Sequence, residues 1–234
     1  MNACPGRMLA AFVLLLIGQS AISGAGAQTI QRLQVGLAPF ALNYTGDLTN
    51  EDENFHRVYP GFNVSVQFES PRLVSPQLNF GFGKFTAQDR ELEPVEGILP
   101  NTFVETNYFY FDATLRVRFL RRRKFRPHIG PGLGLLNFTP RGPNGNELAD
   151  DLQSRNVDES YSTTSFFLPL MVGFTWRLND FVAIGMDYKY FLLTTDYVDN
   201  IGELGQRSGN DRLSSLNIGL YLTPAARLRK GTWR

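Results

Sequence analysis

Apolar and polar residues alternate one by one along most of the chain after residue 32. In the stretch 59–85 the apolar positions form two runs separated by the polar break Glu69–Arg72. These positions are Phe62, Val64, Val66, Phe68, Leu78, Phe80 and Phe82. A period of two predicts extended strands with one apolar and one polar face, and two such runs joined by a short break predict a hairpin.

Segments with this alternation recur along the chain, and the connections between them alternate in length. The predicted strands are about 33–44, 62–68, 74–85, 103–120, 125–138, 165–177, 181–192 and 215–222. The long connections are 45–58, 87–102, 139–164 and 193–212, and the short ones are 69–72, 121–124 and 178–180. An even number of strands with strictly alternating long loops and short turns is typical of outer-membrane barrels, whereas a soluble β-sandwich does not need this alternation. We therefore expect an all-β, eight-stranded antiparallel transmembrane β-barrel with long extracellular loops and short periplasmic turns.

The first residues predict the compartment. Arg7 precedes an apolar run over 8–17, and a small-residue tract ends at Ala25-Gly26-Ala27. This pattern is typical of a secretory signal peptide, and the apolar run is too short to span a membrane. We expect a signal peptide over 1–27, a barrel domain over 28–222 and a basic periplasmic tail over 223–234, in the outer membrane of a Gram-negative bacterium.

The single cysteine and the charge balance exclude two classes of function. Cys4 lies within the segment expected to be removed, so the mature chain would hold neither a disulfide nor a thiolate site. The chain has 23 Lys and Arg against 22 Asp and Glu, and this balance argues against nucleic acid as the partner. The expected surroundings are outer-membrane lipid and lipopolysaccharide.

Acidic residues gather in the long loops, and basic residues gather at the predicted periplasmic end. The basic candidates for periplasmic docking are Arg72, Arg121, Arg122, Arg123, Lys124, Arg126, Arg227, Arg229 and Lys230. They would either attract anionic lipid headgroups or dock an acidic periplasmic partner. The turn 121–124 carries more charge than a tight turn requires, which favours docking.

The polar face of the strands predicts what fills the barrel. Eight strands leave an interior that side chains just fill, so no wide channel is expected. The charged residues assigned to this interior are Glu105, Asp112, Arg116, Arg118, His128, Asp187 and Lys189. Because buried charges must be paired, they predict a salt-bridge plug, and the alternative is a proton or solute path.

The residues offer little for catalysis. A serine nucleophile needs a histidine within hydrogen-bond reach, and Ser160, Ser162 and Ser165 could approach His56 only through loop geometry that no spacing requires. Metal-ligand spacing and glycine-rich phosphate loops are absent from the sequence, and the acidic loops lack EF-hand spacing. We expect a non-enzymatic protein without cofactor or metal.

Three stretches, Tyr44–Leu48, Asn137–Gly142 and Thr195–Asn200, and the glycine-rich run Arg126–Gly134 carry a resemblance. In this order they resemble the small outer-membrane β-barrel family of OmpA/OmpX-like eight-stranded barrels that includes PorG of the type IX secretion system. The residues of the family-like motif are Tyr44, Gly46, Asp47, Asn137, Pro140, Thr195, Asp196, Tyr197 and Asp199. The resemblance implies contact with periplasmic ring or lipoprotein components of a secretion complex. Independently, the short oxygen side chains at 195, 196 and 199 suit a rigid loop base, where they bond nearby backbone N–H groups.

These observations leave three hypotheses of function. The first is an anchor or accessory subunit of a protein-secretion complex. The second is a free-standing surface barrel whose acidic loops bind ligands or cations, in adhesion or envelope integrity. The third is a minor pore.

Overall fold

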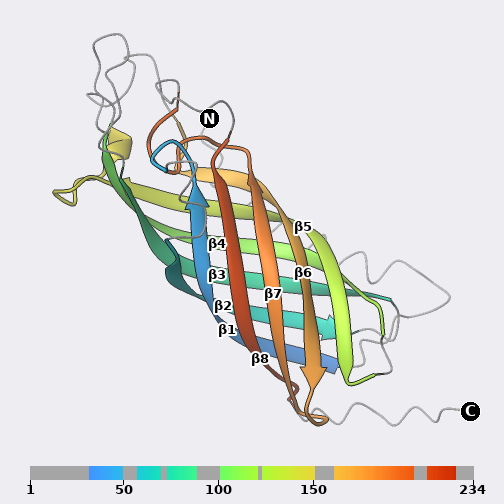
Figure 1. The fold of residues 1–234 in the computed structure, drawn as a ribbon. Helices are drawn as coiled ribbons and strands as arrows, with labels where there is room; N and C mark the ends of the chain where they lie inside the picture. Colours follow the sequence, from blue (N-terminus) through green and yellow to red (C-terminus); the bar gives the residue numbers. More distant parts are fainter. Residues whose placement is uncertain are drawn as a thin grey trace, which may run out of the picture.

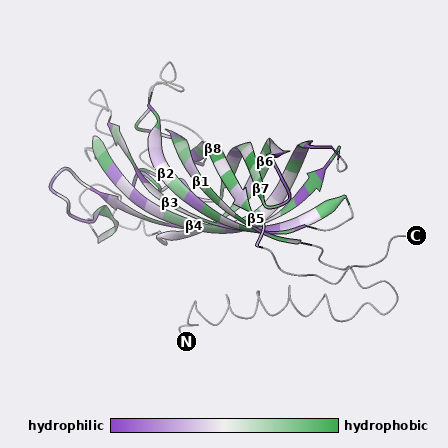
Figure 2. Cartoon of the chain, turned by 90° about the horizontal axis from the view of Figure 1, so that it is seen from below, coloured by the Kyte–Doolittle hydropathy of each residue, from purple (hydrophilic) through white to green (hydrophobic). Residues whose placement is uncertain are grey.

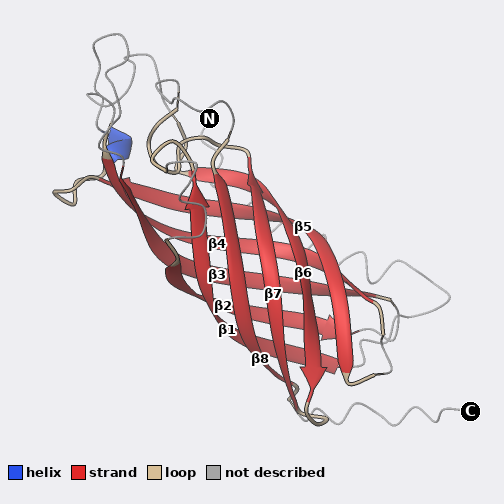
Figure 3. Cartoon of the chain, viewed as in Figure 1, coloured by secondary structure: helices blue, strands red, loops and turns tan. Residues whose placement is uncertain are grey.

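The chain forms one closed barrel in which every strand pairs with its neighbours in sequence (Figure 1). The computed structural model describes residues 32–49, 57–69, 73–88, 101–120, 123–150, 161–202 and 210–224. The strands are β1 (Arg32–Thr45), β2 (Tyr59–Glu69), β3 (Val74–Gln88), β4 (Phe103–Arg118), β5 (Phe125–Arg141), β6 (Thr164–Arg177), β7 (Val182–Leu193) and β8 (Arg212–Leu222). A short 3₁₀ helix, η2 (Leu148–Asp150), follows β5 (Figure 3). The predicted eight-stranded antiparallel barrel is confirmed.

Closure is made by β8, which pairs antiparallel with both β7 and β1. Thr45 lies opposite Arg212 at one end of the β1–β8 ladder, and Val35 lies opposite Leu222 at the other. This pairing removes the open edges that a sheet would otherwise present. It also brings segments from the two ends of the barrel domain side by side, which matters for the loop base described below.

The long loops and the short turns lie at opposite ends of the barrel. At the turn end, the Asn179 side chain accepts hydrogen bonds from the backbone N–H groups of Phe181 and Val182, each at 2.8 Å. The strands β3, β4 and β5 are 15, 16 and 17 residues long and extend furthest at the loop end. A tilted strand needs only roughly 9–11 residues to cross a bilayer. The barrel therefore extends beyond the membrane on the loop side. Among the described residues, no helix is long and apolar enough to cross a membrane.

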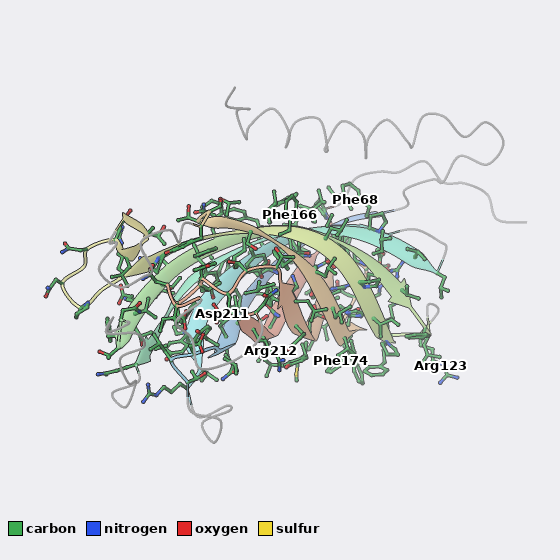
Figure 4. The ribbon with its side chains drawn as sticks, turned by 90° about the horizontal axis from the view of Figure 1, so that it is seen from above. Phe68, Arg123, Phe166, Phe174, Asp211 and Arg212 are labelled. Atoms are coloured by element: carbon green, nitrogen blue, oxygen red, sulfur yellow. The ribbon has the colours of Figure 1, made fainter. Side chains whose placement is uncertain are left out.

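The outer wall is apolar, and bands of hydrophobic and hydrophilic residues alternate along each strand (Figure 2). Phe166 is 67% exposed and Ile218 is 62% exposed, and both point away from the interior. Figure 4 shows Phe166 and Phe174 on the outside of the barrel. So many exposed large apolar side chains around the wall match a surface that faces lipid.

The interior is divided into two zones. The half toward the long loops holds a cluster of buried aromatic and aliphatic side chains, among them Tyr110, Phe138, Phe167 and Phe191. Tyr110 makes edge contacts with Phe167 and Phe191, with ring centroids 6.1 Å and 5.2 Å apart. The half toward the short turns is filled by polar and charged side chains. The polar filling was predicted from the sequence, but the aromatic core was not.

Gly81 on β3 allows the Tyr110 ring of this aromatic core to lie close against the wall. A Cβ atom at Gly81 would lie 2.3 Å from Cζ of Tyr110, whose side chain is fully buried. We predict that Gly81→Ala destabilises the folded barrel by about 1–3 kcal/mol, because the surrounding rings leave Tyr110 no room to move. Denaturant unfolding in phospholipid vesicles measures this change.

A double-mutant cycle provides the control. Gly81→Ala combined with Tyr110→Val should cost less than the sum of the two single changes, since removal of the ring makes room for the methyl group. Simple additivity of the two changes would show that the proposed contact is absent.

Candidate functional site

The centre of the barrel holds an ion pair that crosses from β7 to β4. Lys189 Nζ donates to Asp112 Oδ2 at 2.7 Å, and both side chains are buried. The other carboxylate oxygen, Oδ1, accepts hydrogen bonds from Asn79 Nδ2 (2.6 Å) and Thr114 Oγ1 (2.7 Å). Lys189 Nζ also lies 5.0 Å from the centroid of the Tyr110 ring. The lysine thus stands where the polar and aromatic zones meet.

Asp187, two residues before Lys189 on the same face of β7, gathers a second set of partners. Arg116 Nη2 lies 3.2 Å from Oδ2, which also accepts a hydrogen bond from Tyr221 Oη at 2.7 Å. His128 Nε2 lies 2.7 Å from Oδ1. Arg116 reaches further to Gln67 Oε1 at 3.1 Å. The charges predicted near mid-strand are therefore paired with one another across the barrel, and His128 belongs to the same network.

Glu69, at the mouth of the barrel on the turn side, has three arginine partners. The guanidinium groups of Arg118, Arg126 and Arg177 lie 2.7, 2.8 and 3.4 Å from its carboxylate oxygens. Glu69 and Arg177 were missed in the sequence because Glu69 was assigned to the turn. Glu69, however, lies two and four positions after Gln67 and Ser65, both of which face inward, so it lies on the same face of β2. This even spacing was the signal available in the sequence.

The prediction that Glu105 faces the interior is wrong. Seven positions separate Glu105 from the inward-facing Asp112, and an odd separation on a strand places the two side chains on opposite faces. Glu105 lies on the outer face, where its carboxylate pairs with the exposed Lys84 at 3.2 Å.

Among the predicted docking residues, Arg123 and Lys124 are exposed at the turn end, and Figure 4 shows Arg123 at that end of the barrel. Arg126 differs from them because it faces inward and only 11% of its side chain is exposed. Its guanidinium contacts Glu69 and the carbonyl oxygen of Arg123. The remaining candidates lie outside the described residues: Arg72, Arg121, Arg122, Arg227, Arg229 and Lys230.

At the opposite end, most of the family-like motif meets in one buried cluster. Tyr44 Oη lies 2.6 Å from Asp199 Oδ2 and 2.9 Å from Asp211 Oδ1. Gly46 is required there, because a Cβ atom would lie 1.8 Å from Tyr44 Oη. Asp199 Oδ1 accepts the N–H of Ile201 at 2.9 Å, as expected for a rigid loop base. Asp211 was missed because it becomes a neighbour of Tyr44 only when β8 pairs with β1.

Electrostatics in this cluster favour the protonated forms of the acids. Burial raises the pKa of Asp199 to about 7, and the negative charges of Asp47 and Asp196 act in the same direction. Burial and the Asp47 charge raise the pKa of Asp196 to about 7. Burial, Asp199 and Asp196 raise the pKa of Asp211 well above its ordinary value. The loop base therefore holds carboxyl groups that resist ionisation near neutral pH.

The aromatic residues around the cluster bind the loops to the barrel. Tyr197 stacks on Tyr161 with ring centroids 4.5 Å apart, and Tyr161 stacks in turn on Phe138 at 6.2 Å. Thr195 Oγ1 accepts the N–H of Tyr197 at 3.3 Å. Pro140 is buried on β5, opposite Thr106 of β4.

Asn137 lies on the outer face of β5 and lines a groove of about 610 Å³ in the wall. Phe62, Phe82 and Phe109 supply the apolar part of the groove, and Lys84 lies at its polar part. The groove opens on the outer wall toward the loop end, beside the exposed Lys84–Glu105 ion pair.

The residues considered for catalysis that the structure describes have other partners. His128 contacts Asp187 inside the barrel, and Ser165 Oγ lies 2.9 Å from Thr194 Oγ1 at the loop end. Ser162 accepts the N–H of Thr164 at 3.2 Å. His56 and Ser160 lie outside the described residues. Within the described ranges, no group of three or more His, Cys, Asp or Glu residues is arranged to hold a metal ion.

Comparison with known proteins identifies a family. The outer membrane protein beta-barrel domain family matches residues 9–222 of the chain. The chain is similar in structure to Neisserial surface protein A (TM-score 0.51, 13% identity, covering 81% of this chain and 96% of that one). It also resembles Ail of Yersinia pestis (0.49, 12%, 82% and 97%) and OprG of Pseudomonas aeruginosa (0.48, 10%, 83% and 97%). At 13% identity, the similarity to Neisserial surface protein A supports the fold alone. No curated protein matches the chain.

The Lys189–Asp112 pair gives a direct test of the network. We predict that Lys189→Met destabilises the barrel by about 3–5 kcal/mol, because it leaves the buried Asp112 carboxylate without its cation. Adding Asp112→Asn should restore most of the loss, since the buried position 112 then carries no unpaired charge. Urea unfolding in lipid vesicles measures both variants.

Lys84→Met is the matched control, because the same substitution then breaks an ion pair on the outer surface. Its effect should stay below about 1 kcal/mol, since 61% of the Lys84 side chain is exposed. Equal losses at positions 84 and 189 would contradict a buried, paired network.

Proposed function

Because the chain belongs to the outer membrane protein beta-barrel domain family, we propose that it is a closed, non-enzymatic barrel that anchors a periplasmic partner in the outer membrane. The partner would be acidic, and the protein would be an accessory subunit of a protein-secretion complex of the type IX kind. The resemblance of the stretches 44–48, 137–142 and 195–200 to the family that includes PorG supports this finer assignment.

The filled interior is the observation that carries the proposal. Lys189, Arg116 and Asp112 are among the most deeply buried side chains, and each is joined to a partner from another strand. Above them, Tyr110, Phe167 and Phe191 pack ring against ring. A solute moving along the barrel would have to break both the ion pairs and the aromatic packing. The proposal therefore places the function at the two ends of the barrel and not in its lumen.

Charge at the turn end supports a partner of opposite sign. Three arginine guanidinium groups share the single carboxylate of Glu69, so this cluster keeps a net positive charge. Arg123 and Lys124 add exposed positive charge beside it, whereas Asp180 in the neighbouring turn contributes one negative charge. A surface of this kind attracts an acidic protein and orients it through complementary charge.

A second candidate function is binding at the extracellular surface. It is favoured by the packing of Leu48, Val198 and Ile201 into the hydrophobic core at the loop end. Loops that begin from a rigid scaffold are a common place for the recognition of a ligand or a neighbouring protein.

The secretion role predicts a specific defect. Deletion of the gene should leave one class of secreted proteins in the periplasm, measured by comparing the proteins of the medium and the periplasm. Complementation with a chain that carries Gln at four positions of the periplasmic rim should fail to restore their export, because the partner loses its charged contact. The positions are Arg121, Arg122, Arg123 and Lys124.

The control removes four positive charges from the loop end. Its substitutions to Gln are at Arg57, Lys84, Arg141 and Arg212, and this chain should complement the deletion fully. Unchanged export in the deletion strain would refute the secretion role. Full complementation by the rim variant, with its barrel folded, would refute docking through the rim while leaving the secretion role in place.

A further inference from the structure

Tyr44, Asp199 and Asp211 meet from three separate parts of the chain. Tyr44 lies near the end of β1, Asp199 lies in the loop after β7, and Asp211 directly precedes β8. Their exposed fractions are 4%, 0% and 2%. Figure 4 shows Asp211 at the end of the barrel opposite Arg123. The cluster thus joins the long loop between β7 and β8 to the end of β1.

The hydrogen atoms in this cluster can be counted. A phenol has one hydrogen to donate, yet Tyr44 Oη lies within hydrogen-bond distance of two carboxyl oxygens, at 2.6 Å and 2.9 Å. Tyr44 satisfies one of these contacts by donating its hydrogen. The other contact requires a hydrogen from the carboxyl group, because two bare oxygens would face each other with lone pairs alone.

In each of the two carboxyl groups, the oxygen that does not face Tyr44 already accepts a hydrogen bond. Asp199 Oδ1 accepts the N–H of Ile201, and Asp211 Oδ2 accepts the N–H of Val198, both at 2.9 Å. The additional proton therefore belongs on an oxygen that faces Tyr44. One proton shared between Asp199 and Asp211 satisfies every contact in the cluster.

Among the described residues, the charged groups that act on the pair are acids, and they do not supply a cation in place of this proton. The charges that act on it come from Asp47, in the loop after β1, and from Asp196, in the loop after β7. From the other elements, the contacts to the same loop come from neutral groups: Asn101 before β4, Thr106 on β4 and Tyr161 before β6. Burial and the two additional acids raise the pKa of Asp199 to about 7.

We propose that a proton shared by Asp199 and Asp211 through Tyr44 is a latch that holds the extracellular loop base closed, and that its loss opens this base. The segment around Asp199 also forms hydrogen bonds with other parts of the barrel. Thr106 Oγ1 donates to Val198 O at 2.7 Å, and Tyr161 Oη donates to Asn200 Oδ1 at 2.7 Å. Asn101 Nδ2 donates to Asp199 O at 3.0 Å. Opening of the loop base at Asp199 therefore also weakens its contacts with β4 and with the segments before β4 and β6.

The direction of the pH effect follows from proton binding. The closed state binds a proton that the open state releases, so the latch is fully stabilising at acid pH and weakens as pH rises through about 7. For one carboxyl group with an ordinary pKa in the open state, the opening equilibrium should rise roughly 30-fold between about pH 5.5 and about pH 8.5.

Hydrogen exchange of the backbone amides of 194–202 measures this opening in the full barrel in phospholipid nanodiscs with EDTA, after correction for the intrinsic pH dependence of exchange. The wild-type chain should lose protection between the two pH values. Asp211→Asn should abolish the dependence, because its amide N–H donates permanently to Tyr44 while its carbonyl still accepts the N–H of Val198. Asp199→Asn likewise places an amide N–H opposite Tyr44 and should also abolish the pH dependence.

Glu147→Gln is the matched control, because it makes the same chemical change at a 52% exposed carboxylate of the same barrel end. It should keep the wild-type pH dependence. The proposal is overturned if wild-type protection is equal at both pH values or if both asparagine variants retain the dependence. Lower protection at about pH 5.5 with EDTA than in a parallel sample without EDTA would also overturn it, since a metal ion and not a proton would then join the carboxyl groups.

Discussion

The pairing of charges inside a narrow barrel is the constraint on which the rest of this structure depends. The outer wall faces lipid and must be apolar, so the alternating polar residues of every strand are directed into an interior with little room for water. A charge placed there is stable only with a partner. Lys189 and Asp112, and Arg116 and Asp187, meet this requirement across the barrel by joining β7 to β4. These ion pairs fix the relative positions of strands that do not pair through their backbones.

The two interior zones have different consequences for the two ends. The ionic zone ends at the periplasmic mouth in three arginines around Glu69, so positive charge remains available where a partner would dock. The aromatic zone continues upward into Leu48, Val198 and Ile201, so the extracellular loops begin from a packed base. The carboxyl groups beside this base lie in an apolar environment, and their resistance to ionisation follows from that burial. The proposed docking at one end and the proposed proton-dependent base at the other are therefore parts of one filled barrel.

Most of the fold could be predicted because a period of two determines the face of every residue on a strand, and the alternation of loop lengths determines which end is which. The same rule explains the error at Glu105, whose odd separation from Asp112 places it outside, and the omission of Glu69, whose parity with Gln67 places it inside. Asp211 could not be found this way. It is 167 positions from Tyr44 in sequence and reaches it only through the closure of β8 on β1. The aromatic core was missed for a related reason, since Phe40, Tyr110 and Phe191 become neighbours only across the closed barrel.

The central claim is that paired charges and aromatic rings close the lumen, and single-channel recording in planar bilayers tests it most directly. The wild-type barrel, shown to be inserted and folded, should give no steady conductance at either polarity. A stable conductance whose size changes with Asp112→Asn or Lys189→Met would contradict the account, because ions would then pass along the network that is described here as a seal.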